Sequence, residues 1–117
     1  MKVIIAGTRT FNDYQLLKNK VDNILQDYLN EKIIICSGGA SGADALGERY
    51  ATEKGLPLKY FFANWSLYGR GAGPIRNAQM ADYADLAICF WDAKSTGTKN
   101  MIEQMKRRNK KFVIIFI

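Results

Sequence analysis

Residues 36–44 read Cys-Ser-Gly-Gly-Ala-Ser-Gly-Ala-Asp, and this segment decides how the chain is interpreted. It follows the apolar run Ile33–Ile35 and opens a helix-like segment that extends from Ala43 to Lys54. In many α/β proteins, a strand that ends in a glycine-rich turn and leads into a helix forms a phosphate cradle. The glycines let an anion approach the backbone, and the helix start offers unpaired N–H groups. The segment therefore predicts that the chain holds a nucleotide-like ligand.

Apolar runs and helix-like segments alternate on both sides of this turn. We expect strands at 3–6, 33–36, 58–62, 86–91 and 112–117, helices at 13–29, 43–54, 74–83 and 98–108, and an irregular stretch at 63–73. Because the expected strands are almost wholly apolar, they suit a parallel sheet that is covered by helices on both faces. The prediction is one α/β domain over residues 1–117. It is a Rossmann-like three-layer sandwich with five parallel strands in the order 3-2-1-4-5.

Length, charge and composition narrow the class of protein. The chain has 117 residues, of which 48% are hydrophobic, so it has room for one domain with a real core. Its 17 Lys and Arg residues outnumber 11 Asp and Glu residues, and the net charge of +6 favours nucleotides, nucleic acid or acidic lipid as partners. The absence of histidine excludes Ser–His and Cys–His catalysis and His-containing metal sites.

The two cysteines and the N-terminal apolar run indicate a cytoplasmic protein. Cys36 and Cys89 lie far apart and match neither a metal-binding spacing nor a Cys-x-x-Cys motif, so we expect buried free thiols. The apolar run at 3–6 is too short for a signal peptide or a membrane span. We therefore expect no membrane partner.

Four loops follow the expected strands at their carboxyl ends, where ligands bind in folds of this class. In the loop after the first strand, Arg9 suits pairing with an anion in fork geometry. Two interpretations of Asp44 remain. Its negative charge either stabilises the positive start of the helix, or its carboxylate accepts hydrogen bonds from ribose hydroxyls. The full set expected to contact the ligand is Gly7, Thr8, Arg9, Ser37, Gly38, Gly39, Ala40, Ser41, Gly42, Asp44, Trp65, Gly73, Arg76, Asn77, Ser95, Gly97 and Thr98.

Three further features each have more than one interpretation. Trp65 and Tyr68 either pack locally, stack on a base or seal the pocket of a second subunit. The segment Ser95–Thr98 is either a helix N-cap alone or a second anion cradle. The basic group at 106–111 is either a solvated helix end or a nucleic-acid contact, and we expect it at the end of the sheet opposite the four loops.

The chain resembles the SLOG superfamily of Rossmann-like domains, and within it the small YspA-like branch of bacterial and phage proteins. The resemblance extends from Lys2 to about Val113 and follows several motifs in the same order. It implies a nucleotide-binding domain and a homodimer or larger homo-oligomer. The motifs that carry it are Gly7-Thr8-Arg9, the glycine-rich segment 37–44, residues 72–80, residues 84–88 and Ser95-Thr96-Gly97-Thr98.

The SLOG superfamily includes LOG-type phosphoribohydrolases, sensor domains for nucleotide-derived signals and DprA-type DNA-binding proteins. LOG enzymes share Arg-x-x-x-Met and, after a strand, Pro-Gly-Gly-x-Gly-Thr-x-x-Glu. The first motif is matched at Arg76–Met80 and the Gly-Thr pair at Gly97–Thr98, whereas the Pro-Gly-Gly portion is absent. The Glu position holds Met101, and Glu103 lies about 200° further around a helix. We therefore expect that the catalytic carboxylate of LOG enzymes is missing.

These observations favour a binding protein over an enzyme. The leading hypothesis is a sensor or sequestering protein for a nucleotide or nucleotide-derived small molecule. The first alternative is a LOG-like N-glycosidic hydrolase, with Asp44, Asp92 and Arg76 as catalytic candidates. The second alternative is a nucleic-acid-associated protein like the DprA branch. The sequence shows no metal site and implies no cofactor beyond the nucleotide, although Mg²⁺ held through a phosphate would leave little trace.

Overall fold

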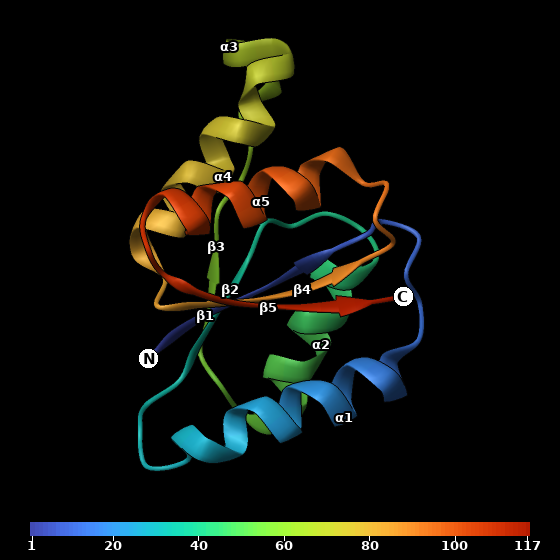
Figure 1. Cartoon of the computed structure of the whole chain (residues 1–117), viewed down its shortest axis with the longest axis vertical. Helices are drawn as coiled ribbons and strands as arrows, with labels where there is room; N and C mark the ends of the chain where they lie inside the picture. Colours follow the sequence, from blue (N-terminus) through green and yellow to red (C-terminus); the bar gives the residue numbers. More distant parts are fainter.

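The computed structural model describes residues 1–117, with helices packed on both faces of a parallel sheet (Figure 1). The strands are β1 (Lys2–Gly7), β2 (Ile34–Ser37), β3 (Leu58–Tyr60), β4 (Leu86–Trp91) and β5 (Lys111–Phe116), in the order β3-β2-β1-β4-β5. The helices are α1 (Tyr14–Leu25), α2 (Ala43–Lys54), α3 (Trp65–Tyr68), α4 (Ala72–Tyr83) and α5 (Thr96–Arg107). All neighbouring strands pair in parallel, so the predicted fold class and strand order are confirmed.

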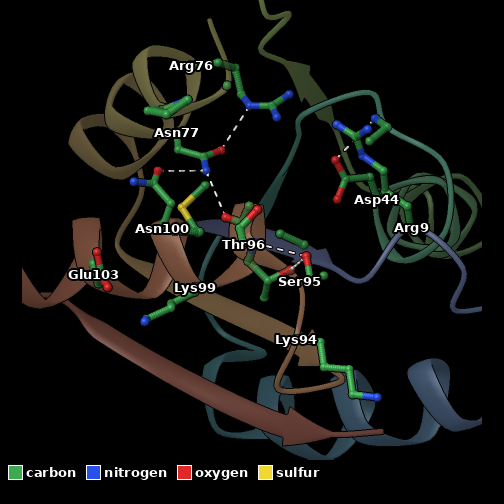
Figure 2. Close-up of a pocket in the computed structure, with 18 of the residues that line it drawn as sticks. Arg9, Asp44, Arg76, Asn77, Lys94, Ser95, Thr96, Lys99, Asn100 and Glu103 are labelled. Carbon is green, nitrogen blue, oxygen red and sulfur yellow. Dashed lines mark hydrogen bonds between the residues drawn. The ribbon is translucent and has the colours of Figure 1, made fainter. Parts of the chain in front are cut away.

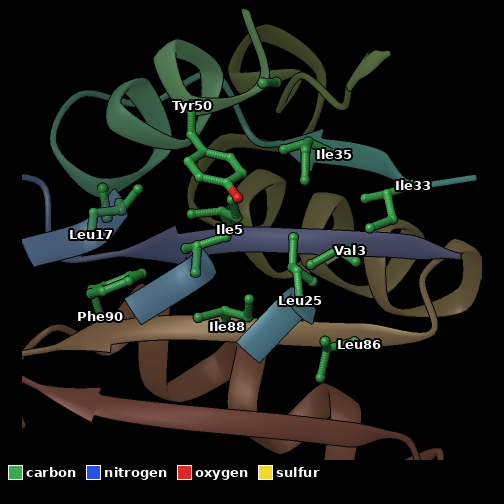
Figure 3. Close-up of a cluster of buried hydrophobic side chains, with 13 residues drawn as sticks. Val3, Ile5, Leu17, Leu25, Ile33, Ile35, Tyr50, Leu86, Ile88 and Phe90 are labelled. Carbon is green, nitrogen blue, oxygen red and sulfur yellow. The ribbon is translucent and has the colours of Figure 1, made fainter. Parts of the chain in front are cut away.

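Successive side chains of β1 point to opposite faces of the sheet, and each face has its own apolar layer. Val3 and Ile5 face α1 and α2, where they pack with Leu17 and Tyr50 (Figure 3). On the other face, Ile4 meets small and flexible side chains of α4 and α5, namely Met80, Ala81, Met101, Ile102 and Met105. Because both faces of the central strands are buried, these strands are apolar without alternation.

Several elements begin or end away from their expected positions. The first helix stops at Leu25, because Gln26–Tyr28 tighten into a 3-10 turn. The strand β3 ends at Tyr60 instead of Phe62. The last helix begins at Thr96 because Ser95 caps it, with its hydroxyl oxygen accepting from the N–H of Thr98.

The stretch 63–73, which we expected to be irregular, contains the short helix α3 and the 3-10 turn η2 (Gly69–Gly71). Asn64 is the N-cap of α3, because its side-chain oxygen accepts from the N–H of Leu67. Four residues are too few to show a helical period in the sequence, which is why the helix was not predicted. In Figure 1, α3 projects beyond the layer formed by α4 and α5.

Two glycines let three loops meet at the carboxyl edge of the sheet. A Cβ atom on Gly7 would lie 2.1 Å from the carbonyl oxygen of Phe90, at the end of β4. A Cβ atom on Gly42, whose φ is +74°, would lie 2.4 Å from the carbonyl oxygen of Thr8. Only residues without a Cβ fit at these positions. The loops after β1, β2 and β4 therefore approach closely enough to form one site.

The two cysteines are buried free thiols, as predicted. Burial raises the pKa of Cys36 and of Cys89 to about 12, so both thiols stay protonated and unreactive at neutral pH. None of the helices combines the length and the apolar character that a membrane span requires.

The contact between Gly7 and Phe90 gives a test of the fold. We expect Gly7→Ala to lower the free energy of unfolding by about 1–3 kcal/mol or more, because the new methyl group overlaps a backbone carbonyl. Gly97→Ala is the matched control, since a Cβ there meets nothing within 4 Å. Chemical denaturation of both variants measures the difference, and equal stabilities would contradict the close approach of β1 and β4.

Candidate functional site

A cleft of about 800 Å³ opens at the carboxyl edge of the sheet, where the loops after β1 and β4 meet the starts of α4 and α5 (Figure 2). Cavities of this size hold small organic ligands. Its wall carries more cations than acids, and these charged residues are Arg9, Arg70, Arg76, Lys94 and Lys99 against Asp44 and Glu103. This excess of positive charge favours an anionic ligand.

The start of α5 supplies hydrogen-bond donors to the cleft. Thr96 and Gly97 line the cleft and belong to the first turn of α5, where backbone N–H groups have no partner within the helix. No acidic residue lies in that turn, and Lys94 and Lys99 flank it. The positive end of the helix dipole adds to these charges. The start of α5 therefore offers an anion in the cleft backbone donors with lysines beside them.

Asn77 joins α4 to this turn. Its side-chain amide donates to the carbonyl oxygen of Gly97 and to Oδ1 of Asn100, both at 3.1 Å, and its own oxygen accepts from Nε of Arg76 at 3.0 Å (Figure 2). Nη1 of Arg76 in turn donates to the carbonyl oxygen of Gly38 at 2.6 Å. These hydrogen bonds fix the Arg76 guanidinium between the start of α5 and the glycine-rich loop.

Asp44 is a buried carboxylate in the wall beside Arg76 and Arg9. It accepts from the N–H of Ala40 at 3.3 Å. Burial raises the pKa of Asp44, and the bond from Ala40 and the charge of Arg76 only partly oppose this effect. Burial also lowers the pKa of Arg76. The cleft therefore contains one acid that is easier to protonate than an exposed carboxyl group.

At the start of α2, which we expected to cradle a phosphate, groups of the protein itself take the place of an anion. The N–H of Ala43 donates to the carbonyl oxygen of Thr8 at 3.2 Å, and the Asp44 carboxylate occupies the first turn. A second anion at that point would meet like charge. Phosphate binding by the remaining residues of the glycine-rich loop stays a prediction.

Four of the candidate residues line neither the cleft nor the smaller cavity beside it, and three of them have structural partners that explain their positions. The Ser37 hydroxyl donates to Glu48 at 2.6 Å. The Thr8 hydroxyl accepts from the N–H of Asp92 at 3.2 Å. The Asp92 carboxylate accepts from the N–H groups of residues 94 and 95, which lower its pKa and shape the turn before α5. Gly42, the fourth, serves the close approach of the loops described above.

The structure brings most of the other predicted residues together. The main cleft is lined by Gly7, Arg9, Ala40, Asp44, Trp65, Gly73, Arg76, Asn77, Ser95, Gly97 and Thr98. A smaller adjoining cavity is lined by Gly38, Gly39 and Ser41, together with Arg9, Ala40, Trp65 and Arg76. Tyr68 lines neither cavity.

Sequence reasoning missed several residues of the wall. Glu103, which lies about 200° around α5 from the Glu position held by Met101, also lines the cleft. The helix begins at Thr96, so Thr96, Lys99, Asn100 and Glu103 share one face at spacings of three, four and seven residues. The spacing of Lys99, Asn100 and Glu103 is the same in the expected helix 98–108 and was the signal for these three residues, whereas Thr96 depends on the earlier start of α5. No cluster of three acidic or cysteine side chains suited to a metal ion is present.

The basic group at 106–111 is largely engaged in contacts within the protein. Nζ of Lys110 donates to the carbonyl oxygens of Ala81 and Asp82, at the end of α4. Arg108 pairs with the Asp82 carboxylate at 2.6 Å. The positive side chains thus meet the negative end of α4, at the end of the sheet opposite the cleft.

Comparisons with known proteins assign the chain to a family. The model of the YspA, cpYpsA-related SLOG family (YAcAr) matches residues 1–68, which is more than half of the chain. The chain belongs to this family. The matched region includes the glycine-rich loop and ends in α3. No curated protein matches the chain.

The fold is similar to that of a solved DNA-processing protein. The X-ray structure of DNA processing protein A (DprA) from Streptococcus pneumoniae superposes with a TM-score of 0.75 at 17% sequence identity. The match covers 97% of this chain and 49% of that chain, so this chain spans about half the length of that protein. At this identity the similarity shows the Rossmann-like fold.

The raised pKa of Asp44 gives a pH-dependent test. Because the folded-state pKa lies above the usual value, ionised Asp44 opposes folding at neutral pH, and this opposition decreases as the pH falls from the folded-state pKa and is gone below the pKa of the unfolded chain. We expect Asp44→Asn to raise Tm at about pH 7.5 and to raise it much less at about pH 4. A Tm difference that does not change with pH, measured by thermal unfolding, would contradict the burial of this charge.

Proposed function

We propose that the protein binds a nucleotide or a nucleotide-derived small molecule in the cleft and acts as a sensor or a sequestering protein. The observation that carries the proposal is the cleft itself, where five cations and the first turn of α5 surround space for a small anionic molecule. The excess of cations suits phosphate groups, and the side-chain amides of Asn77 and Asn100 add neutral polar groups to the wall.

Binding without turnover agrees with the chemistry of the wall. Arg76 and Asn77 are held by hydrogen bonds to the protein, so they are positioned as contacts rather than as groups that move protons. The wall contains no histidine, because the chain has none. A sensor or sequestering protein needs only donors in fixed positions.

Hydrolysis of an N-glycosidic bond is a second candidate, supported by the buried carboxyl group of Asp44 in the cleft wall. A carboxyl group with a raised pKa is suited to proton transfer near neutral pH. This candidate predicts release of free base from nucleoside monophosphates, and loss of that release in Asp44→Asn. A ligand recovered intact after incubation with the protein favours the binding proposal.

A role in association with nucleic acid is a third candidate, supported by the net charge of +6 and by the fold that the chain shares with a DNA processing protein. It predicts an affinity for single- or double-stranded DNA that falls steeply with salt concentration. The homodimer or larger homo-oligomer implied by the family resemblance stays a prediction, which the molecular mass in solution tests.

The two arginines of the wall give the test of the proposed site. We expect Arg9→Ala and Arg76→Ala each to weaken nucleotide binding by about 1–3 kcal/mol, because each removes a charge-assisted contact with phosphate. Isothermal titration calorimetry with the nucleotide that mass spectrometry finds enriched on the protein measures the change. Lys20→Ala is the matched control, since Lys20 is exposed on α1 and lines neither cavity.

Thermal unfolding must show that both arginine variants are folded, since Arg76 is partly buried. Affinities that stay within the error of the wild type in both folded variants would contradict a phosphate site in the cleft. A loss that is equal in Lys20→Ala would indicate a general effect of charge.

A further inference from the structure

A second cavity of about 380 Å³ adjoins the main cleft, and the proposed phosphate site does not use it. Its walls come from the glycine-rich loop after β2 and from residues 62–65 after β3. The two cavities share the side chains of Arg9, Trp65 and Arg76, which stand at their boundary. A ligand in the main cleft can therefore extend into this second cavity past two cationic groups.

The second cavity has an aromatic and cationic wall. Phe62 and Trp65 are its aromatic residues, and both are exposed. Arg9 and Arg76 are its charged residues, and no carboxylate lines it. A planar ring that carries a phosphate matches this combination, because the ring can stack on an aromatic side chain while the phosphate pairs with arginine.

Phe62 is held in place although 71% of its surface is exposed. Its ring stacks on that of Tyr60, with centroids 5.4 Å apart and planes within 7°. It also lies against the glycine-rich loop, where a Cβ on Gly39 would come within 2.9 Å of the ring. The neighbouring Phe61 instead packs against Tyr83. An exposed ring in a fixed position favours stacking with a ligand, because its side chain loses little conformational entropy when the ligand covers it.

The partner of Phe62 is itself fixed by hydrogen bonds. The Tyr60 hydroxyl donates to Oε1 of Glu48 at 3.2 Å, and the Ser37 hydroxyl donates to Oε2 of Glu48 at 2.6 Å. Ser37 also accepts from the N–H of Gly39 at 3.1 Å. One network thus sets both the aromatic pair and the loop that faces it. This is a role for Ser37 that does not require contact with the ligand.

We propose that the second cavity binds the nucleobase of the ligand, stacked on Phe62, while the phosphates pass between Arg9 and Arg76 into the main cleft. The inference rests on the proposed function and names its ligand class, a nucleoside with a chain of phosphates. The orientation follows from the walls, because Phe62 lines only the second cavity and the start of α5 lines only the main cleft.

The test compares probes with and without a base. Isothermal titration calorimetry is carried out with ATP, GTP, CTP and UTP, and with inorganic tripolyphosphate, which has the phosphates alone. We expect at least one nucleoside triphosphate to bind more tightly than tripolyphosphate. Phe62→Ala should weaken that nucleotide about 5- to 150-fold, the range of base–aromatic stacking, and should leave tripolyphosphate binding unchanged. Phe62→Tyr should restore the affinity.

The control is Phe116→Ala, which removes an equally exposed phenylalanine (67%) that lines neither cavity. If a nucleoside triphosphate binds and Phe62→Ala leaves its affinity unchanged, the placement of the base is wrong while the proposed function stands. Equal affinities of all nucleotides and tripolyphosphate for the wild type would also overturn the placement. If no probe binds, the ligand class named here is wrong and the placement fails with it, whereas the proposed function is decided separately by the nucleotides that mass spectrometry finds enriched on the protein.

Discussion

The hydrogen bonds of Thr8 hold the carboxyl edge of the sheet together, and the cleft depends on them. Its N–H donates to the carbonyl oxygen of Phe90 at 2.9 Å, its own carbonyl accepts from Ala43, and its hydroxyl accepts from Asp92. One buried residue after β1 thus ties the end of β4, the start of α2 and the turn before α5. Polar groups buried at strand ends need partners, and here the partners come from the neighbouring loops.

This arrangement determines where negative charge is favoured. The carbonyl of Thr8 accepts from the first N–H of α2, and the Asp44 carboxylate places a negative charge in its first turn, so that helix start is less favourable to an anion. The first turn of α5 stays open to the cleft, with Lys94 and Lys99 beside it. Asp44 then lies between the arginines and the glycine-rich loop, where burial keeps its pKa high. The cleft therefore has a cationic end at α5 and a boundary of arginines that leads to the aromatic cavity.

The fold could be predicted from the sequence because its strands are continuous apolar runs and its turns carry glycine at strand ends. The carboxyl edge was predicted as the site for the same reason. The separate roles of its residues could not be predicted, since a polar side chain such as Thr8 or Ser37 can serve a ligand or a neighbouring loop equally well. The sequence also placed Phe62 in a strand, whereas β3 ends at Tyr60 and the Phe62 ring is exposed beyond it. The place of Glu103 in the wall could not be predicted, because the angle of a side chain around a helix does not show which faces border a cavity.

Chemical-shift mapping of the backbone amides by NMR, during titration with a nucleotide, tests the central claim that the cleft binds an anionic ligand. The account predicts that the largest shifts are those of Thr96 and Gly97 at the start of α5 and of Gly38–Ser41 in the loop. Small shifts are expected for the amides of residues 106–111, at the end of the sheet opposite the cleft. Shifts confined to that basic group, or spread evenly over the surface, would contradict the account.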